Sequence, residues 1–214
     1  MSTEILLIRH GETAWNAVRR LQGHIDIALN EAGLRQAGAL AQALAGEPLA
    51  AIVASDLQRA LQTAEAVAAS HHLPVHADPA LRERGYGAFE GMLYTEIEAA
   101  YPADFAAWQA REVDACMPAG DRLAESFRQF YARSTAAIAH WAARYPGQRI
   151  AVVAHGGVLE CAYRAATGMA LDRPRDFQIK NASVNRFAWD GGQLRLAQWG
   201  DTSHLAALAL DDVI

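Results

Sequence analysis

Two apolar runs in this chain end in the same polar signature. Residues 5–8 read Ile-Leu-Leu-Ile and lead directly into Arg9 and His10, and residues 150–154 read Ile-Ala-Val-Val-Ala and lead directly into His155. Short apolar runs of this kind are typical of strands that are buried on both faces of a parallel sheet. Because the carboxyl ends of parallel strands meet at one edge, where ligands bind, we expect the two histidines to be neighbours in one pocket.

The residues beside the two histidines indicate the charge of the ligand. Arg9 precedes His10, and each histidine is followed by a glycine, Gly11 or Gly156. A guanidinium group is a planar fork of donors that matches phosphate oxygens two at a time, and glycine lets backbone N–H groups approach an anion closely. These residues predict a phosphate site with histidine chemistry.

A third strand end is expected to reach the same edge. Residues 49–54 read Leu-Ala-Ala-Ile-Val-Ala, and Ser55 to Gln58 have the S-x-x-Q form of a capping box, so a helix is expected to follow the strand with almost no loop. This would place Arg59 at a helix N-terminus, which favours anions. An earlier helix is expected from Asn30, its N-cap, with this apolar face: Leu34, Ala37, Leu40, Ala41 and Leu44.

The remaining segments complete an alternation of strands and helices. A long helical pattern runs from Leu123 to Tyr145, another follows from residue 158 to 166, and Asp190-Gly191 is a hairpin signal. Between about residues 92 and 125 the pattern loosens, and we expect a helical insertion that forms a lid. The alternation predicts an α/β three-layer sandwich, with a mostly parallel central sheet covered by helices on both faces, in a single domain over residues 1–214.

Charge and cysteine content limit the class of protein. The net charge of −5 and the pI near 5.9 argue against a general binder of nucleic acid or of anionic membranes, which would have a basic surface. The two cysteines, Cys116 and Cys161, form neither a C-x-x-C motif nor a disulfide-dense framework, which suits a reducing compartment. The first apolar run is too short for a signal peptide. We expect a cytoplasmic protein that acts on a small phosphorylated substrate, and a homodimer would be compatible with the sequence.

Five ordered blocks carry a resemblance to a known family. They are Leu7-Ile8-Arg9-His10-Gly11-Glu12-Thr13 with Trp15-Asn16, Gln22-Gly23, Ser55-Asp56-Leu57-Gln58-Arg59 with Gln62-Thr63-Ala64, Leu81-Arg82-Glu83, and Val153-Ala154-His155-Gly156-Gly157. In this order they resemble the histidine phosphatase superfamily, also called the phosphoglycerate mutase-like family. The ending Gly200-Asp201-Thr202-Ser203-His204-Leu205 is similar to bacterial members classified as phosphoglycerate mutases of the cofactor-dependent type.

The resemblance implies a role for each matching residue. His10 would be the nucleophile that becomes a phosphohistidine, Arg9, Arg59 and His155 would surround the phosphoryl oxygens, and Glu83 would be the proton donor and acceptor. No metal ligand is implied. The implied substrate-binding residues are Gly11, Asn16, Gln22, Gly23, Tyr86 and Gly156. For the reaction His10 must be neutral, and the adjacent arginines disfavour its protonation.

Taken alone, Glu83 and most of the histidines have an ordinary structural interpretation. Glu83 lies between Arg82 and Arg84, so it could belong to a surface ion pair. A histidine outside the two strand-end positions is more often structural or exposed than catalytic, and we assign that interpretation to His24, His71, His72, His76, His140 and His204.

The sequence departs from the mutases where they would hold the glycerate carboxylate. Tyr94 stands where the resemblance predicts a lysine, and Gln109-Ala110 stands where it predicts two arginines after Trp108, although Arg111 follows directly. We therefore favour hydrolysis of a small phosphomonoester without a cofactor. The alternative is a phosphoglycerate mutase, which would require 2,3-bisphosphoglycerate as cofactor.

Two further alternatives differ in class. Cys116 and Arg122 have the C-x₅-R spacing of cysteine-dependent phosphatases, but no apolar strand precedes them and Asp121 would place a carboxylate at the phosphate. A non-catalytic protein that binds a phosphorylated ligand would need the cations, yet it would gain nothing from Glu83 as a proton donor.

Overall fold

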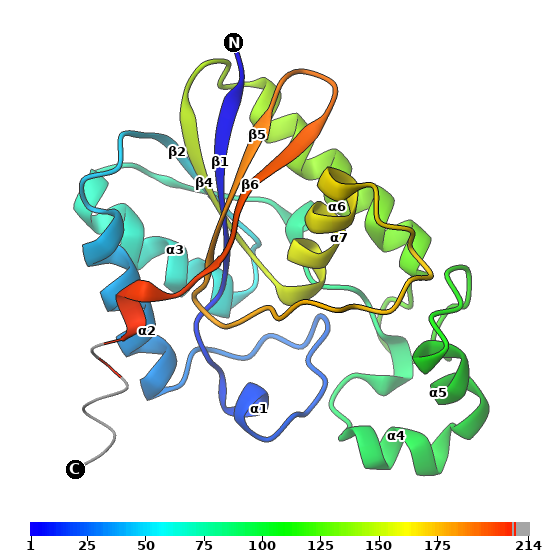
Figure 1. Cartoon of the computed structure of the whole chain (residues 1–214). Helices are drawn as coiled ribbons and strands as arrows, with labels where there is room; N and C mark the ends of the chain where they lie inside the picture. The colour runs from blue at the N-terminus through cyan, green and yellow to red at the C-terminus, as the bar shows by residue number, and fades with distance from the viewer. Residues whose placement is uncertain (207, 209–214) are drawn as a thin grey trace.

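The computed structural model describes residues 1–206 and 208, and its centre is a six-stranded sheet in the order β3-β2-β4-β1-β5-β6 (Figure 1). The strands are β1 (Thr3–Arg9), β2 (Leu49–Ala54), β3 (Val75–Ala77), β4 (Arg149–Ala154), β5 (Val184–Trp189) and β6 (Leu194–Asp201). The strands β1 to β4 are parallel to one another, whereas β5 pairs antiparallel with β1 and β6 pairs antiparallel with β5. The expected α/β fold with a mostly parallel sheet is confirmed.

Helices cover both faces of this sheet. Along β1, Ile5 and Leu7 pack in the cluster that contains α6 (Phe127–Ala143) and α7 (Gly156–Thr167). Leu6 and Ile8 pack on the opposite face with α2 (Glu31–Leu44) and α3 (Gln58–His71). All four β1 side chains are fully buried, because successive residues of a strand point to opposite faces and both faces are covered.

Asn30 is the N-cap of α2, as predicted, and its side chain accepts from Gly33 N at 2.8 Å. The predicted buried face of α2 was wrong at Leu34, which is 54% exposed. Gly33 takes the buried position at this end of the helix, whereas Ala37, Leu40 and Leu44 are buried as predicted. Only glycine fits at residue 33, since a Cβ there would lie 2.0 Å from the carbonyl oxygen of Glu12.

The capping box predicted for α3 is not formed. The N-cap is Leu57, and the Oγ of Ser55 is 3.4 Å from the Leu57 N–H, too early in the chain to cap the first turn. Instead, the Asp26 carboxylate accepts from the backbone N–H of Gln58 at 2.7 Å. Asp26, which is distant in the sequence, therefore has the capping role that the local sequence predicted for Ser55.

The expected insertion contains two short helices, α4 (Tyr94–Ala100) and α5 (Pro102–Gln109), which lie beyond the edge of the sheet (Figure 1). Apolar side chains of both helices belong to a small cluster whose buried members are Leu21, Phe89, Ile97 and Met117. After α5 the chain is irregular up to Ser126, which caps α6. The long helix thus begins at Phe127 and not at Leu123, which is 54% exposed.

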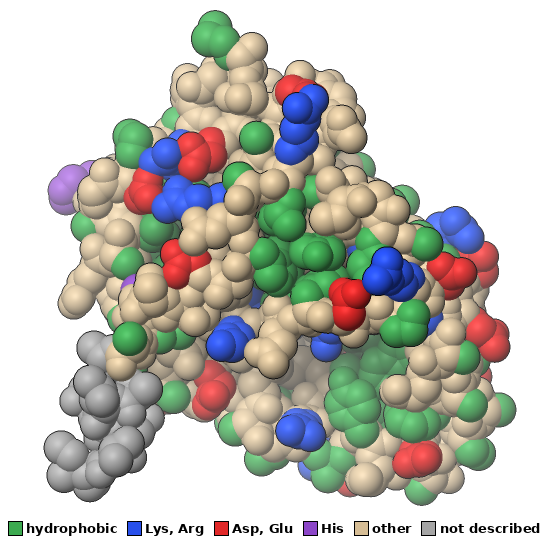
Figure 2. All heavy atoms as spheres, viewed as in Figure 1, with side chains coloured by type: hydrophobic (Ala, Val, Ile, Leu, Met, Phe, Trp, Pro, Cys, Tyr) green, Lys and Arg blue, Asp and Glu red, His purple; other side chains and the backbone are tan. Residues whose placement is uncertain are grey.

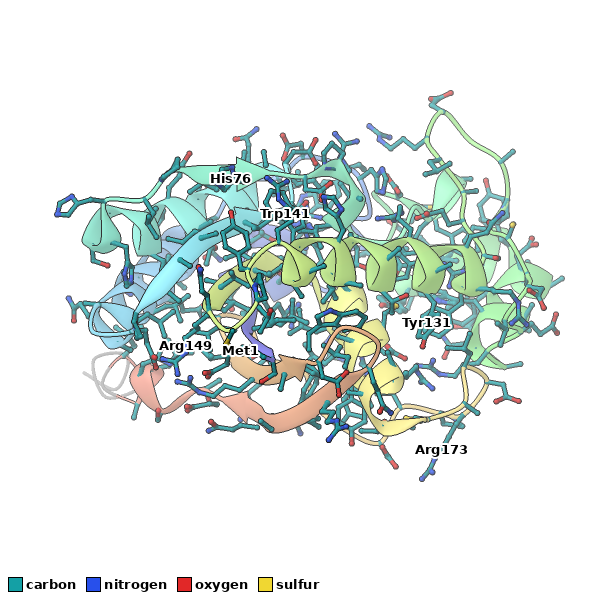
Figure 3. The ribbon with its side chains drawn as sticks, turned by 90° about the horizontal axis from the view of Figure 1, so that it is seen from above. Met1, His76, Tyr131, Trp141, Arg149 and Arg173 are labelled. Atoms are coloured by element: carbon teal, nitrogen blue, oxygen red, sulfur yellow. The ribbon has the colours of Figure 1, made fainter. Side chains whose placement is uncertain are left out.

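The other elements are α1 (Ala14–Ala17) and short 3-10 turns at Pro79–Leu81, Gly87–Phe89 and Ser203–Leu205. The predicted hairpin at Asp190-Gly191 joins β5 to β6. Seen from above, α6 crosses one face of the sheet with Trp141 beside His76 of β3, their ring centroids 5.4 Å apart (Figure 3). Among residues 1–206 and 208, no helix is long and apolar enough to cross a membrane.

Candidate active site

β1 and β4 lie side by side in parallel, so their carboxyl ends deliver adjacent residues. Arg9 is opposite Ala154 in the register, and the His10 backbone N–H donates to the Ala154 carbonyl at 3.0 Å. The imidazole rings of His10 and His155 are 5.2 Å apart between centroids. The chain visits β2 and β3 before it returns to β4 between β2 and β1, and a crossover of this kind is where open α/β sheets bind ligands.

A cavity of about 760 Å³ opens at this edge. Figure 2 shows the hollow, with Lys or Arg side chains near its rim. Of the residues predicted for the site, its lining includes Arg9, His10, Asn16, Gln22, Gly23, Arg59, Glu83, Tyr86 and Gly156. The other two, Gly11 and His155, are buried beside His10 and contact it, but do not line the cavity.

His10 is held in one tautomer. Its Nδ1 lies 2.6 Å from the carbonyl oxygen of Gly11, which can only accept, so Nδ1 carries the proton and Nε2 keeps its lone pair. Burial, together with the charges of Arg59 and Arg9, holds the pKa of His10 well below its usual value. His10 is therefore neutral near pH 7 and has the chemistry of a nucleophile at Nε2.

Arg59 is 1% exposed and fixed by three hydrogen bonds. Its terminal nitrogens donate to the carbonyls of Gly23 at 2.8 Å and Ile25 at 2.9 Å, and its Nε donates to His155 Nδ1 at 3.2 Å. Burial is the main cause that lowers the pKa of Arg59 to about 10, so it is still a cation near neutral pH. Because His155 accepts at Nδ1, its proton is on Nε2.

Two donors at this strand edge are buried without an acceptor among the described residues. They are Nε of Arg9 and Nε2 of His155. Arg9 is anchored at its other end, where a terminal nitrogen donates to the Ile179 carbonyl at 2.7 Å. An unpaired buried donor costs free energy, and a phosphoryl group at this position would supply acceptors for both.

Glu83 is not part of a surface ion pair with its neighbours. Arg82 binds Asp56 at 2.6 Å, and Arg84 donates from Nε to the Glu125 carbonyl at 2.9 Å. The Glu83 carboxylate instead accepts two backbone N–H groups, from Arg84 at 2.8 Å and from Gly157 at 3.0 Å. This places a carboxylate at the cavity wall, with its position fixed by the backbone.

The comparisons with known proteins agree with this geometry. The family model described as "Histidine phosphatase superfamily (branch 1)" matches residues 5–202. The chain belongs to the histidine phosphatase superfamily. Among relatives, it is 40% identical to "Phosphoglycerate mutase-like protein 4" of Arabidopsis thaliana, with 94% of this chain and 86% of that protein covered. It is 38% identical to "Metal-independent phosphoserine phosphatase" of the same plant, with 96% and 84% covered.

A solved structure of a histidine phosphatase fold supports the same assignment. "Bacillus stearothermophilus YhfR" superimposes with a TM-score of 0.87 at 36% identity, and the match covers 95% of this chain and 99% of that chain. The sheet and its two helical layers are therefore similar to those of this solved structure.

Sequence reasoning missed three residues that hold the candidate site of this histidine phosphatase. His24, expected to be structural or exposed, lies with Nε2 2.8 Å from the Glu83 carbonyl oxygen, and Arg133 donates to the same oxygen at 3.2 Å. Asn181 donates to the carbonyls of His10 at 3.0 Å and Gly11 at 3.2 Å. These contacts join segments far apart in the chain, and no local motif indicates them.

The C-x₅-R segment forms no phosphate site. Cys116 is exposed, and its Sγ lies 3.8 Å from the Gln129 side chain. Arg122 is directed to Glu90, at 3.6 Å. In the part of the chain that the structure describes, no three His, Cys, Asp or Glu side chains are grouped so that they could hold a metal ion.

Proposed function

We propose that this histidine phosphatase is a metal-independent phosphomonoesterase that hydrolyses a small phosphorylated metabolite through a phosphohistidine on His10. The observation that carries the proposal is the state of His10: it is neutral, its Nδ1 proton is bound by the Gly11 carbonyl, and its Nε2 is available beside buried cationic donors. Phosphoryl transfer requires in-line positioning and charge stabilisation, and fixed arginines supply both.

In the first step, Nε2 of His10 attacks phosphorus while the bond between phosphorus and the leaving oxygen breaks. Arg9, Arg59 and His155 stabilise the charge on the phosphoryl oxygens, and Glu83 donates a proton to the leaving oxygen. In the second step, Glu83 accepts a proton from water, which attacks phosphorus, and the bond to Nε2 breaks. Dividing the reaction into two displacements makes each one easier.

The other predicted residues position the substrate. Asn16, Gln22, Gly23 and Tyr86 line the cavity around the reacting group. Gly156 is the first residue of α7, so its backbone N–H belongs to the positive end of a 12-residue helix. We also propose that the protein acts in the cytoplasm, where its two free cysteines stay reduced.

Hydrolysis is favoured over mutase activity by the state of Arg111. This residue was the one feature of the segment that pointed to a mutase, and its guanidinium is 2.8 Å from the buried carboxylate of Glu160. Its guanidinium is therefore held in an ion pair within the protein. The activity named for the Arabidopsis phosphoserine phosphatase supports hydrolysis as well.

The test is hydrolysis of an aryl phosphate in the presence of EDTA. Wild type and Cys116→Ser are expected to release phosphate at the same rate, and His10→Ala is expected to lose turnover. A wild type that is inert towards phosphomonoesters but interconverts phosphoglycerates would favour the mutase. Saturable binding of phosphate esters without any product would favour a binding protein.

A further inference from the structure

The cavity continues beyond the reacting group, and its outer part is positively charged. Besides Arg9 and Arg59, its lining includes Arg19, Arg20 and Arg175, whereas the acidic residues of the lining are Glu83 and Glu160. The whole chain carries a net charge of −5, so this excess of cations is local. Arg9 and Arg59 bind the phosphoryl group in the proposed mechanism, whereas the outer arginines have no role in it.

Arg175 lies near a carboxylate that is already fully compensated. Glu160 is 2.8 Å from Arg111 and 2.8 Å from the buried Arg164, and its distance to Arg175 is 3.6 Å. Three guanidinium groups thus share one carboxylate. The Arg175 side chain is 45% exposed and makes the longest of the three contacts. It is therefore the arginine of the three whose charge is free to bind a ligand.

Arg19 lines the same cavity. It follows α1, is exposed, and has a left-handed backbone conformation with φ of 56°. Within residues 1–206 and 208, the structure contains no ion pair of Arg19. Arg20 differs, since it pairs with Glu96 at 3.8 Å and stacks on Trp15.

The charges of both arginines influence the hydroxyl of Tyr94. Burial raises the pKa of this hydroxyl, while the charges of Arg175, Arg19 and Arg9 act against this rise. Tyr94 also lines the cavity, and its ring stacks on Trp108 with a centroid distance of 5.4 Å, which fixes its position.

We propose that Arg19 and Arg175 form an outer anion site, beside Tyr94, that binds a second acidic group on the leaving group of the substrate. This inference rests on the proposed function and names its substrate class: phosphomonoesters whose alcohol carries a carboxylate or a second phosphate. A cationic leaving group is disfavoured, because the carboxylate of Glu160 is enclosed by arginines.

The test compares substrates that differ only in the second group. 3-Phosphoglycerate carries a carboxylate where sn-glycerol 3-phosphate carries a hydroxymethyl group, and glycerol 1,3-bisphosphate carries a second phosphate. We expect kcat/KM for phosphate release from one or both acidic substrates to exceed that for glycerol 3-phosphate by at least about tenfold, the smaller effect of a charged hydrogen bond. The acidic substrate that shows the higher kcat/KM identifies the second group as a carboxylate or a phosphate.

Two variants and a matched control locate the effect. Arg175→Gln and Arg19→Gln are each expected to lower the acidic-to-neutral ratio of kcat/KM by about fivefold, a reduced value because both side chains are partly solvated. The control is Arg173→Gln, which removes the same charge from a side chain that points away from the molecule (Figure 3) and pairs with Asp176. It should keep the wild-type ratio.

A measurement on the wild type alone provides a second test. The ratio should fall as ionic strength rises from about 50 mM to about 500 mM, because charges at an exposed site are screened. O-Phosphoethanolamine, whose leaving group is a cation, should be a poorer substrate than glycerol 3-phosphate.

The outcomes separate this inference from the proposed function. If wild type hydrolyses an aryl phosphate but shows a ratio near one for both acidic substrates, the outer site is wrong and the phosphatase stands. If Arg173→Gln lowers the ratio as much as Arg175→Gln, the effect is one of general charge and the inference also fails. If wild type hydrolyses no phosphomonoester, the proposed function itself is wrong.

Discussion

Replacing Gly157 by alanine should slow the reaction strongly, because it displaces the Glu83 carboxylate. A Cβ at this position would lie 2.2 Å from Oε1 of Glu83 and 2.7 Å from a ring carbon of Phe130. Atoms in contact are about 3.5 Å apart, so the Glu83 carboxylate would have to move by more than about 1 Å. A misplacement of this size costs about 100-fold in rate, or about 2.7 kcal/mol in the barrier.

The assay is steady-state hydrolysis of an aryl phosphate, with urea unfolding of the same samples. Gly157→Ala is expected to lower kcat by about 100-fold. Gly38→Ala is the matched control, because it lies within α2 and a Cβ there meets nothing within 4 Å. It should keep full activity and gain up to about 1 kcal/mol in unfolding free energy. A folded Gly157→Ala with wild-type kcat would refute the position assigned to Glu83.

Three further predictions follow from the same geometry. The pKa values of His10 and His155 are held well below 6.5 in the folded protein, so the unfolded chain binds protons first as pH falls. The free energy of unfolding should therefore decrease as the pH is lowered from 6.5, and this decrease should be smaller for His10→Asn than for wild type. Urea titrations that show the same pH dependence for both proteins would contradict this. Arg133→Met removes the hydrogen-bond donors of the carbonyls of residues 80, 82 and 83. The free energy of unfolding in urea should fall by about 2–3 kcal/mol, and kcat should fall as well. An unchanged urea midpoint would argue against this support. Cys116→Ser should keep its kcat/KM, and a loss of activity would revive the cysteine mechanism.

The sequence predicts the strand ends of this fold better than its helix surfaces. The runs before His10 and His155 are short, apolar and followed by glycine, and such local features suffice to predict parallel strands at one edge. Leu34 was misplaced because Gly33, which has no side chain, takes the buried position that the apolar pattern assigned to its neighbour. The periodicity of apolar side chains cannot predict that a glycine is buried by backbone contacts.

The supporting contacts of the site could not be predicted for a different reason. Asp26 caps α3, and Asn181 binds the carbonyls of residues 10 and 11, across separations of 32 and about 170 residues. Ser55 had the right side chain for the cap but the wrong distance along the chain. Which side chain fills such a position depends on the tertiary structure, and the local pattern carries no signal for it.

In the proposed mechanism, His10 is the residue that carries the phosphoryl group. The most direct measurement is rapid acid-free quenching of wild type with a ³²P-labelled phosphomonoester, followed by mapping of the labelled peptide. We predict a label on His10 that is stable in base and labile in acid, formed and discharged at rates consistent with turnover, and absent from His10→Ala. Turnover without a labelled enzyme, or a label that persists in His10→Ala, would contradict the proposed mechanism.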